Sequence, residues 1–271
     1  MIEFLYRLSD AKIFLYLAAG TVIFSLLIII LNKIFTFYTL KYDDNTTTAS
    51  IASLIGIIYG VLVGLTCLYL LNNQDHALNA AMNEGTAAAN IYRESKWLKG
   101  PMQHQIQGQL KTYLTNVITV EWPMMGKGKN LETGSDTLIN KMADEIITYP
   151  IIAKADEIIV TNLLQEINDL FKSRQQRITI NNNQLSPEIW VVVFISTILI
   201  IAINYAFKVN FSLHVFALSA FAFMASCVLF LLVTLDRPFQ GEFIVEPDTL
   251  KAVLNSMSDV KDSKPDNITK R

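Results

Sequence analysis

Small residues recur at every fourth position in one long uncharged stretch of the chain. Gly56, Gly60 and Gly64 follow this spacing, and Ser53 extends the same helical face. Small residues four positions apart let two helix backbones approach closely, so tight helix packing is one interpretation. A pore wall is the other, because small side chains leave room for water and ions. The sequence leaves both interpretations open.

Polar residues follow the glycines along the same predicted helix. A ring of Asn or Asp side chains contributed by several subunits could select ions at the end of a pore. The candidate pore-lining residues are therefore Ser53, Gly56, Gly60, Gly64 and Asn72, and the candidates for a cytoplasmic mouth are Asp75 and Glu84.

Two adjacent opposite charges, Asp236 and Arg237, follow the last apolar stretch. Such charges are costly to desolvate at a membrane boundary unless each finds a partner. Arg237 could bind a lipid phosphate or a carboxylate such as Glu84 or Glu121. Pro238 would stop the helix, and Gly241 would permit a tight turn. We predict a structural lock formed by Asp236, Arg237, Pro238, Gly241 and Glu121, with ion binding as the alternative role.

Residues for enzymatic chemistry are scattered. His76, His104 and His214 are far apart, and the two cysteines, Cys67 and Cys227, lie in separate apolar stretches. The sequence has no glycine-rich phosphate loop, no paired-cysteine motif and no Gly-x-Ser-x-Gly elbow. We therefore expect no enzyme activity, no bound metal and no cofactor.

Four windows without any charged residue indicate the elements that position these side chains. They are Ile13–Asn32, Asn45–Gln74, Ile189–Phe207 and Val209–Leu235. A helix that crosses the hydrocarbon core of a bilayer needs about 20 mainly apolar residues. Only 17% of the chain is charged. The pattern predicts an all-α integral membrane protein with four transmembrane helices and a helical cytoplasmic domain inserted between the second and third.

The predicted organisation has four parts. A first transmembrane hairpin occupies 1–72, with spans at about 13–35 and 50–72, and a cytoplasmic helical domain follows at 73–187. A second hairpin occupies 188–235, with spans at about 188–207 and 212–235. A cytoplasmic tail covers 236–271. The second span is expected to continue to Trp97 as one long helix. The next helix is expected to end at Pro123, and the charged residues after Leu250 are expected to be disordered.

The distribution of Lys and Arg predicts the orientation. With four spans, both termini and the middle domain share one side of the membrane, and that side carries the excess of positive residues near the spans. By the positive-inside rule, it is the cytoplasmic side of a plasma or bacterial inner membrane. Acidic and basic residues nearly balance in the middle domain, so we expect no nucleic-acid binding.

The closing segment resembles the bestrophin-like membrane family of unknown function. The residues that carry the resemblance are Leu235, Asp236, Arg237, Pro238, Phe239 and Gly241, with Val245 and Pro247 behind them. Three other segments fit the same pattern: Asn72 to Tyr92, Tyr113 to Pro123, and Leu185 to Trp190. The resemblance covers roughly residues 50–250.

The resemblance implies a distant relation to bestrophins, which are pentameric, mainly anion-conducting channels with a pore lined by the second helix. This sequence lacks the acidic run of the animal bestrophin calcium clasp, and its second span offers only Tyr59 and Tyr69 for an aromatic neck. The leading hypothesis is a homo-oligomeric ion channel or channel-like protein with a pore lined by the second span. Its expected partners are the lipid bilayer, inorganic ions and further copies of the chain, and the resemblance to bestrophins implies a pentamer. The alternative is a non-conducting scaffold or stress-signalling protein that binds partners through its cytoplasmic helices.

Overall fold

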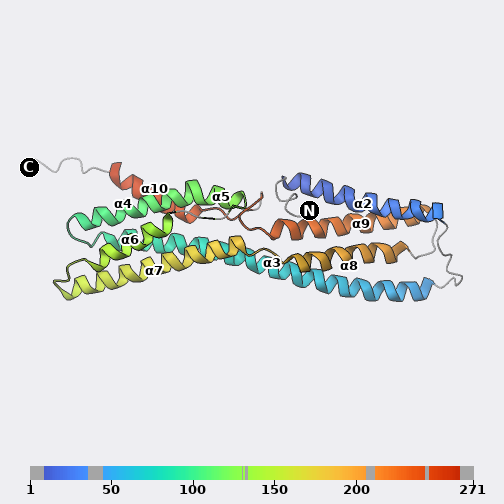
Figure 1. The fold of residues 1–271 in the computed structure, drawn as a ribbon, viewed down its shortest axis with the longest axis horizontal. Helices are drawn as coiled ribbons and strands as arrows, with labels where there is room; N and C mark the ends of the chain where they lie inside the picture. Colours follow the sequence, from blue (N-terminus) through green and yellow to red (C-terminus); the bar gives the residue numbers. More distant parts are fainter. Residues whose placement is uncertain are drawn as a thin grey trace, which may run out of the picture. The chain divides into compact units, whose positions relative to one another are not determined.

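The structure is a computed structural model that describes residues 9–35, 45–129, 131, 134–205, 211–241 and 244–262. In this part of the chain the regular elements are all helical (Figure 1). They are α2 (Asp10–Phe35), α3 (Asn45–Ser95), α4 (Pro101–Asn116), the π-helix η1 (Val117–Glu121), α5 (Trp122–Gly126), α6 (Ser135–Ile147), α7 (Lys154–Asn182), α8 (Pro187–Tyr205), α9 (Phe211–Leu235) and α10 (Asp248–Asp262).

The chain divides into two compact units. Unit 1 comprises Met1–Asn73, Gln184–Arg237 and Gly241–Phe243, and unit 2 comprises Gln74–Asn183, Pro238–Gln240 and Ile244–Arg271. The long helix α3 contributes to both units. It runs unbroken for 51 residues because no proline interrupts it and the glycine in its second half, Gly85, is tolerated. The prediction of one continuous second helix agrees with this element.

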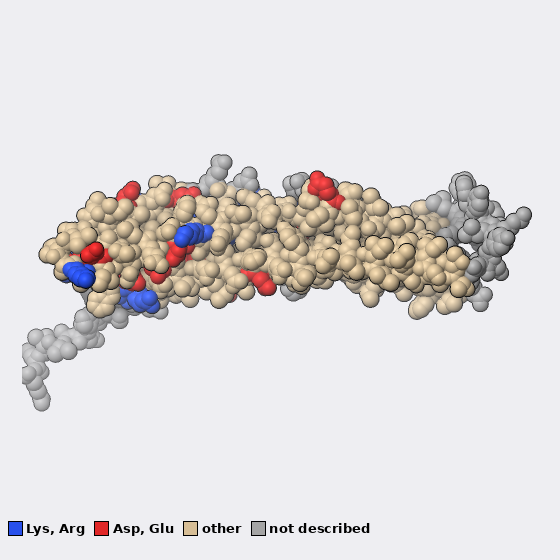
Figure 2. Space-filling view, turned by 90° about the horizontal axis from the view of Figure 1, so that it is seen from below, with Lys and Arg blue, Asp and Glu red and all other residues tan. Residues whose placement is uncertain are grey.

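Segments of α2, α3 and α9 are long and apolar enough to cross a membrane. Among the described residues three helices meet this requirement, and a fourth does if α7 and α8 are counted together as one bent span. Phe14 of α2 packs edge-on against Phe223 and Phe230 of α9, with ring centroids 6.0 and 5.4 Å apart. The surface of unit 1 seen in Figure 2 is mostly uncharged, as expected for helices whose solvent is lipid.

Helix α3 contacts α8 within unit 1. The hydroxyl groups of Tyr59 and Thr197 are 3.2 Å apart and share a hydrogen bond. Thr197 also donates to the backbone oxygen of Val193. The opposite side of α3 stays exposed within the single chain, including Leu54, Ile57, Ile58, Val61 and Leu65.

Unit 2 is built from the second half of α3 and the helices α4 to α7 and α10. Its core is one apolar cluster, which includes Ala88, Ile91, Leu110, Leu114, Met142, Leu163 and Leu250. Buried residues of the cluster recur at intervals of three and four, as Ile139, Met142 and Ile146 do in α6, which is the spacing of one buried helical face.

Two predictions of local structure were wrong. Pro123 does not end the helix before it, because the π-helix η1 and then α5 continue to Gly126, with proline in the first turn of α5. Proline is tolerated there because that position needs no hydrogen-bonding N–H. The tail does not become disordered at Leu250, because α10 continues to Asp262 and buries Leu250, Val253 and Met257. The last residues, 263–271, lie outside the described range.

Candidate functional site

The predicted pore face of α3 is only partly covered by the rest of the chain. Ser53, Gly60 and Gly64 are exposed, and Gly56 is half-buried. A β-carbon added at Gly56 would lie 3.9 Å from the Cδ1 atom of Ile200 in α8. At Gly60 or Gly64 it would meet nothing within 4 Å. The chain therefore leaves two of the three glycines without a packing partner among its described residues.

The candidates for the cytoplasmic mouth lie in different environments. Asn72 and Asp75 are exposed on α3. Glu84 is fully buried in unit 2, with 0% of its side chain accessible. The prediction for Glu84 was wrong, because a side chain that the chain's own helices enclose cannot face an aqueous opening.

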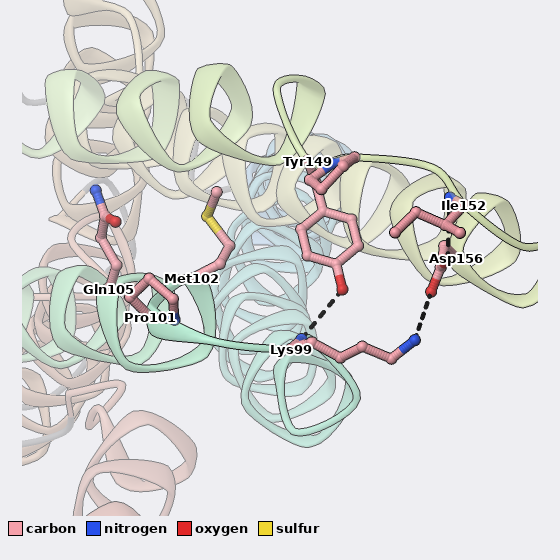
Figure 3. A pocket seen from close by; sticks show the side chains of 8 residues that line it. Lys99, Pro101, Met102, Gln105, Tyr149, Ile152 and Asp156 are labelled. Carbon is pink, nitrogen blue, oxygen red and sulfur yellow. Dashed lines mark hydrogen bonds and ion pairs between the residues drawn. The ribbon is translucent and has the colours of Figure 1, made fainter.

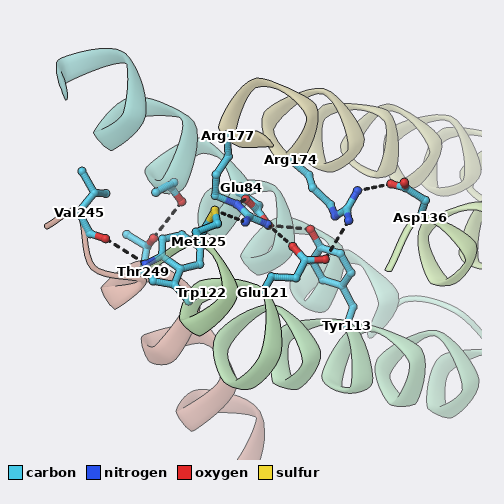
Figure 4. Close-up of polar contacts among 11 residues, drawn as sticks. Glu84, Tyr113, Glu121, Trp122, Met125, Asp136, Arg174, Arg177, Val245 and Thr249 are labelled. Atoms are coloured by element: carbon cyan, nitrogen blue, oxygen red, sulfur yellow. Dashed lines mark hydrogen bonds and ion pairs between the residues drawn. The ribbon is translucent and has the colours of Figure 1, made fainter. Parts of the chain in front are cut away.

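Glu84 belongs to a buried charge cluster, which we define as Glu84, Tyr113, Glu121, Arg174 and Arg177 (Figure 4). Arg177 donates from Nε to Glu84 Oε2 at 2.6 Å and from Nη2 to Glu84 Oε1 at 3.0 Å. This two-point contact matches the planar guanidinium to the planar carboxylate. The Tyr113 hydroxyl donates to Glu84 Oε1 at 2.7 Å. Both Glu84 oxygens are therefore satisfied without water.

Glu121 joins the two arginines of the cluster. Its Oε2 accepts from Arg177 Nη2 at 2.7 Å, and its Oε1 accepts from Arg174 Nη2 at 2.8 Å. Arg174 also pairs with Asp136, whose side chain is 45% exposed. Glu121 is the last residue of η1, and single turns of π-helix are frequent at functional sites. The cluster connects helices α3, α4, η1 and α7, and the pair with Asp136 extends it to α6.

Aromatic and sulfur groups enclose the Arg177 guanidinium. Its Cζ atom lies 4.8 Å from the ring centroid of Trp122, and its Nη1 donates to the sulfur of Met125 at 3.4 Å. The indole N–H of Trp122 donates to the backbone oxygen of Val245 at 2.9 Å. Phe239 packs edge-on against the same indole, with centroids 5.8 Å apart. The segment after α9 therefore covers the cluster within unit 2.

Charge pairing in this dry environment favours the charged arginines and the neutral tyrosine. Burial would lower the pKa of Arg177, but Glu84, with which it forms hydrogen bonds, and Glu121 raise it well above the ordinary value. The pKa of Arg174 is raised by Glu121 and Asp136 against the same effect of burial. Burial and the adjacent Glu84 carboxylate raise the pKa of Tyr113 well above 10.0. At neutral pH the two arginines thus stay charged and Tyr113 stays neutral, which suits a structural joint between helices.

The closing segment forms local contacts in each unit. Within unit 1, the buried Asp236 accepts a hydrogen bond at 2.7 Å from the backbone N–H of Leu185, just before α8, and Arg237 Nη2 donates to Gln184 Oε1 at 3.0 Å. Gly241 has φ of 99°, a conformation that other residues rarely adopt. Glu84 and Glu121, which we considered as partners for Arg237, have Arg177 and Arg174 as cations.

A small pocket in unit 2 adjoins the loops α3–α4 and α6–α7 (Figure 3). Its volume is about 280 Å³, and apolar side chains such as Met102 and Ile152 form much of the lining. The backbone N–H of Lys99 donates to the Tyr149 hydroxyl at 3.1 Å, and Lys99 Nζ lies 3.6 Å from Asp156 Oδ1. We interpret these two contacts as ties that join the loops.

Arg174 and Arg177 are the site residues that sequence reasoning missed, since they were considered only as positive charges near a span. A signal for their burial does exist. Leu163, Ile167, Leu170, Arg174 and Arg177 are spaced 4, 3, 4 and 3 positions apart, so the arginines continue the buried face of α7. In the described ranges no group of three or more His, Cys, Asp or Glu side chains could hold a metal ion.

The sequence matches the Bestrophin-like domain over residues 19–250. The chain belongs to this family. The family predicted from the closing segment is therefore confirmed, and the chain is a multi-pass membrane protein. No curated protein matches the sequence.

Solved structures with a similar fold cover nearly the whole chain. A single-residue variant of a bacterial Bestrophin homologue from Klebsiella pneumoniae has a TM-score of 0.68 at 9% sequence identity, with 94% of this chain and 99% of that chain covered. A second variant of the same homologue has a TM-score of 0.67 at 9% identity, covering 92% and 98%. A structure described as a membrane protein has a TM-score of 0.69 at 11% identity, covering 93% and 99%. At such identities the likeness concerns the fold.

Proposed function

We propose that the chain forms a homo-oligomeric ion channel in a bacterial inner membrane, with the exposed side of α3 lining the pore. Four spans, at α2, the first part of α3, α8 and α9, would place both termini and unit 2 in the cytoplasm. Asp236, Arg237, Pro238 and Gly241 would act as a structural lock at the end of α9, rather than as an ion site.

The observation that carries the proposal is the open space beside Gly60 and Gly64. Glycine in the interior of a helix costs roughly 0.5–1 kcal/mol relative to alanine. Within the chain such a cost is commonly offset by close packing, but the described residues provide no neighbour within 4 Å of a β-carbon at either position. The small side chains are therefore available to an axis or to another copy of the chain.

The exposed apolar residues of α3 support assembly in a bilayer. Leu54, Ile57 and Leu65 are each at least 60% accessible in the single chain. They require lipid or neighbouring subunits as their environment, because water would leave a large apolar area unburied. An apolar pore section of this kind can close by excluding water.

The family provides independent support for conduction. The chain belongs to the Bestrophin-like domain family and has the fold of a bacterial Bestrophin homologue. Bestrophins are pentameric channels, so a pentamer is the expected assembly. Function follows from the site rather than the fold, so this support is an analogy.

The test is reconstitution of the purified full-length chain in planar bilayers, with current measured in several salts. The wild-type chain should conduct. Gly60→Leu should reduce the current while the oligomer stays intact on size-exclusion chromatography, because the larger side chain has space within the protomer but would enter the pore.

Gly20 of α2 provides a matched control. It is also exposed, and a β-carbon there meets nothing within 4 Å. Gly20→Leu should leave the current unchanged. A wild-type chain without current in any salt, or an oligomer whose axis is closed by packed glycines, would contradict the proposal and favour a non-conducting scaffold.

A further inference from the structure

Asp75 is the single charged side chain on the exposed side of α3 between Asn45 and Tyr92. Only Asp75 and Glu84 are charged in this range, and Glu84 is fully buried and paired with Arg177. Asp75 is exposed, and the described residues provide it with neither an ion pair nor a hydrogen bond. Its carboxylate therefore faces its surroundings uncompensated.

Neutral amides flank Asp75 on the exposed part of the helix. Asn72, Asn79 and Asn83 are exposed, and in the described part of the chain their side chains have no hydrogen-bond partner. An amide offers both donors and acceptors, so it can solvate an ion of either sign. The sign of the electrostatic potential along this surface is therefore set by Asp75.

The nearest basic residue on α3 is too distant to cancel this charge. Arg93 follows Asp75 by five helical turns, or about 27 Å along the axis at about 1.5 Å per residue. The Debye length at physiological ionic strength is about 8 Å. Arg93 also interacts electrostatically with the neighbouring carboxylate of Glu94. The two ends of this surface consequently act independently.

We propose that Asp75 gives the channel a preference for cations. This inference rests on the proposed function. In a ring of identical subunits with α3 at the axis, each copy contributes one carboxylate at the same height. Low-dielectric walls concentrate the field of such a ring, which raises the local concentration of cations and excludes anions. The preference is opposite to the anion conduction that the resemblance to bestrophins implies.

The test is the reversal potential of the full-length chain in a KCl gradient across a planar bilayer. The wild-type chain should be more permeable to K⁺ than to Cl⁻. Asp75→Asn should lower the K⁺/Cl⁻ permeability ratio by roughly fivefold or more, since a unit charge about 5 Å from an ion contributes about 1 kcal/mol even in water.

Two further variants distinguish selectivity from folding. Adding Asn79→Asp to Asp75→Asn moves the carboxylate by one helical turn and should restore the cation preference. Arg93→Gln should leave the permeability ratio unchanged. Currents that prefer Cl⁻, or a ratio that Asp75→Asn does not change, would overturn this inference and leave the channel proposal intact. A wild-type chain without current would overturn both.

Discussion

Thr249 of α10 lies directly against Gly85 of α3. A β-carbon at residue 85 would come within 2.6 Å of the Thr249 Cβ atom and 3.1 Å of its backbone carbon. The Thr249 hydroxyl also donates to the backbone oxygen of Ala81 at 3.2 Å. The absence of a side chain at Gly85 therefore lets α10 approach the backbone of α3.

This contact predicts that Gly85→Ala destabilises the docking of α10. The extra methyl group clashes with backbone as well as side-chain atoms, and overpacking of this kind costs roughly 1–3 kcal/mol. In Gly85→Ala, the backbone hydrogen exchange of Asp248–Asp262 should accelerate relative to the wild-type chain, and that of α4 should change less. Gly108→Ala in α4 is the control, because a β-carbon there meets nothing within 4 Å and should be neutral or stabilising. Unchanged exchange in α10 would contradict the prediction.

The buried charge cluster predicts a large loss of stability when one charge is removed. Glu84→Gln leaves the Arg177 guanidinium with a weaker partner in a dry core, which costs roughly 3–5 kcal/mol. Thermal unfolding in detergent should show a clear decrease in melting temperature. Combining Glu84→Gln with Arg177→Met should recover part of that loss, because the double variant removes the buried positive charge that Glu84→Gln leaves in excess.

An exposed ion pair in α7, the helix that carries Arg177, provides the comparison. Lys172 and Asp169 are both more than 40% exposed and lie 3.3 Å apart. Lys172→Gln should change stability by less than about 1 kcal/mol. If Glu84→Gln proved as mild as Lys172→Gln, the cluster would not be an important joint of unit 2.

Tyr113 predicts a pH dependence at the alkaline end. Because burial and Glu84 raise its pKa in the folded chain, the unfolded chain releases the tyrosine proton first as pH rises. The stabilisation is complete below the unfolded pKa of about 10 and decreases as pH rises above it. Tyr113→Phe should flatten the decrease in stability between about pH 10 and 11.

Thermal unfolding at a series of pH values measures this effect. Tyr113→Phe should also lower stability at neutral pH by about 1–2 kcal/mol, since Glu84 loses a donor. Tyr16 of α2, which is 56% exposed, provides the control variant Tyr16→Phe. An equal slope above pH 10 in wild type and Tyr113→Phe would contradict the assignment.

The contact between Asp236 and the segment just before α8 predicts a second position at which substitution lowers stability. Its carboxylate accepts the backbone N–H of Leu185, and the residue is 2% exposed. Asp236→Ala should cost about 1–3 kcal/mol, because it leaves a buried donor without an acceptor. Asp236→Asn keeps an acceptor oxygen and should cost less. Exposed Asp144 serves as the control, and equal melting temperatures for Asp236→Ala and Asp144→Ala would contradict the lock.

The helices of unit 1 and the length of α3 could be predicted because they depend on local properties. Uncharged runs of about 20 residues have few alternatives to a membrane-crossing helix. The family was predicted from one contiguous closing segment that includes Asp236 and Pro238, and the match over residues 19–250 confirms the family. The continuation of the helix through Pro123 could not be predicted, because proline ends most helices and the π-helix that accommodates it leaves no clear sequence pattern.

The amino-acid sequence by itself determined the helical class, the uncharged spans, the small-residue face at Gly56, Gly60 and Gly64, and the family. Each depends on spacing or composition along the chain. Only the tertiary structure decided that Glu84 is enclosed with Arg177, that Gly60 has open space beside it, and that α10 packs on Gly85. These outcomes depend on which distant segments meet, because the same carboxylate can be exposed at a pore mouth or buried in an ion pair on a helix of identical sequence.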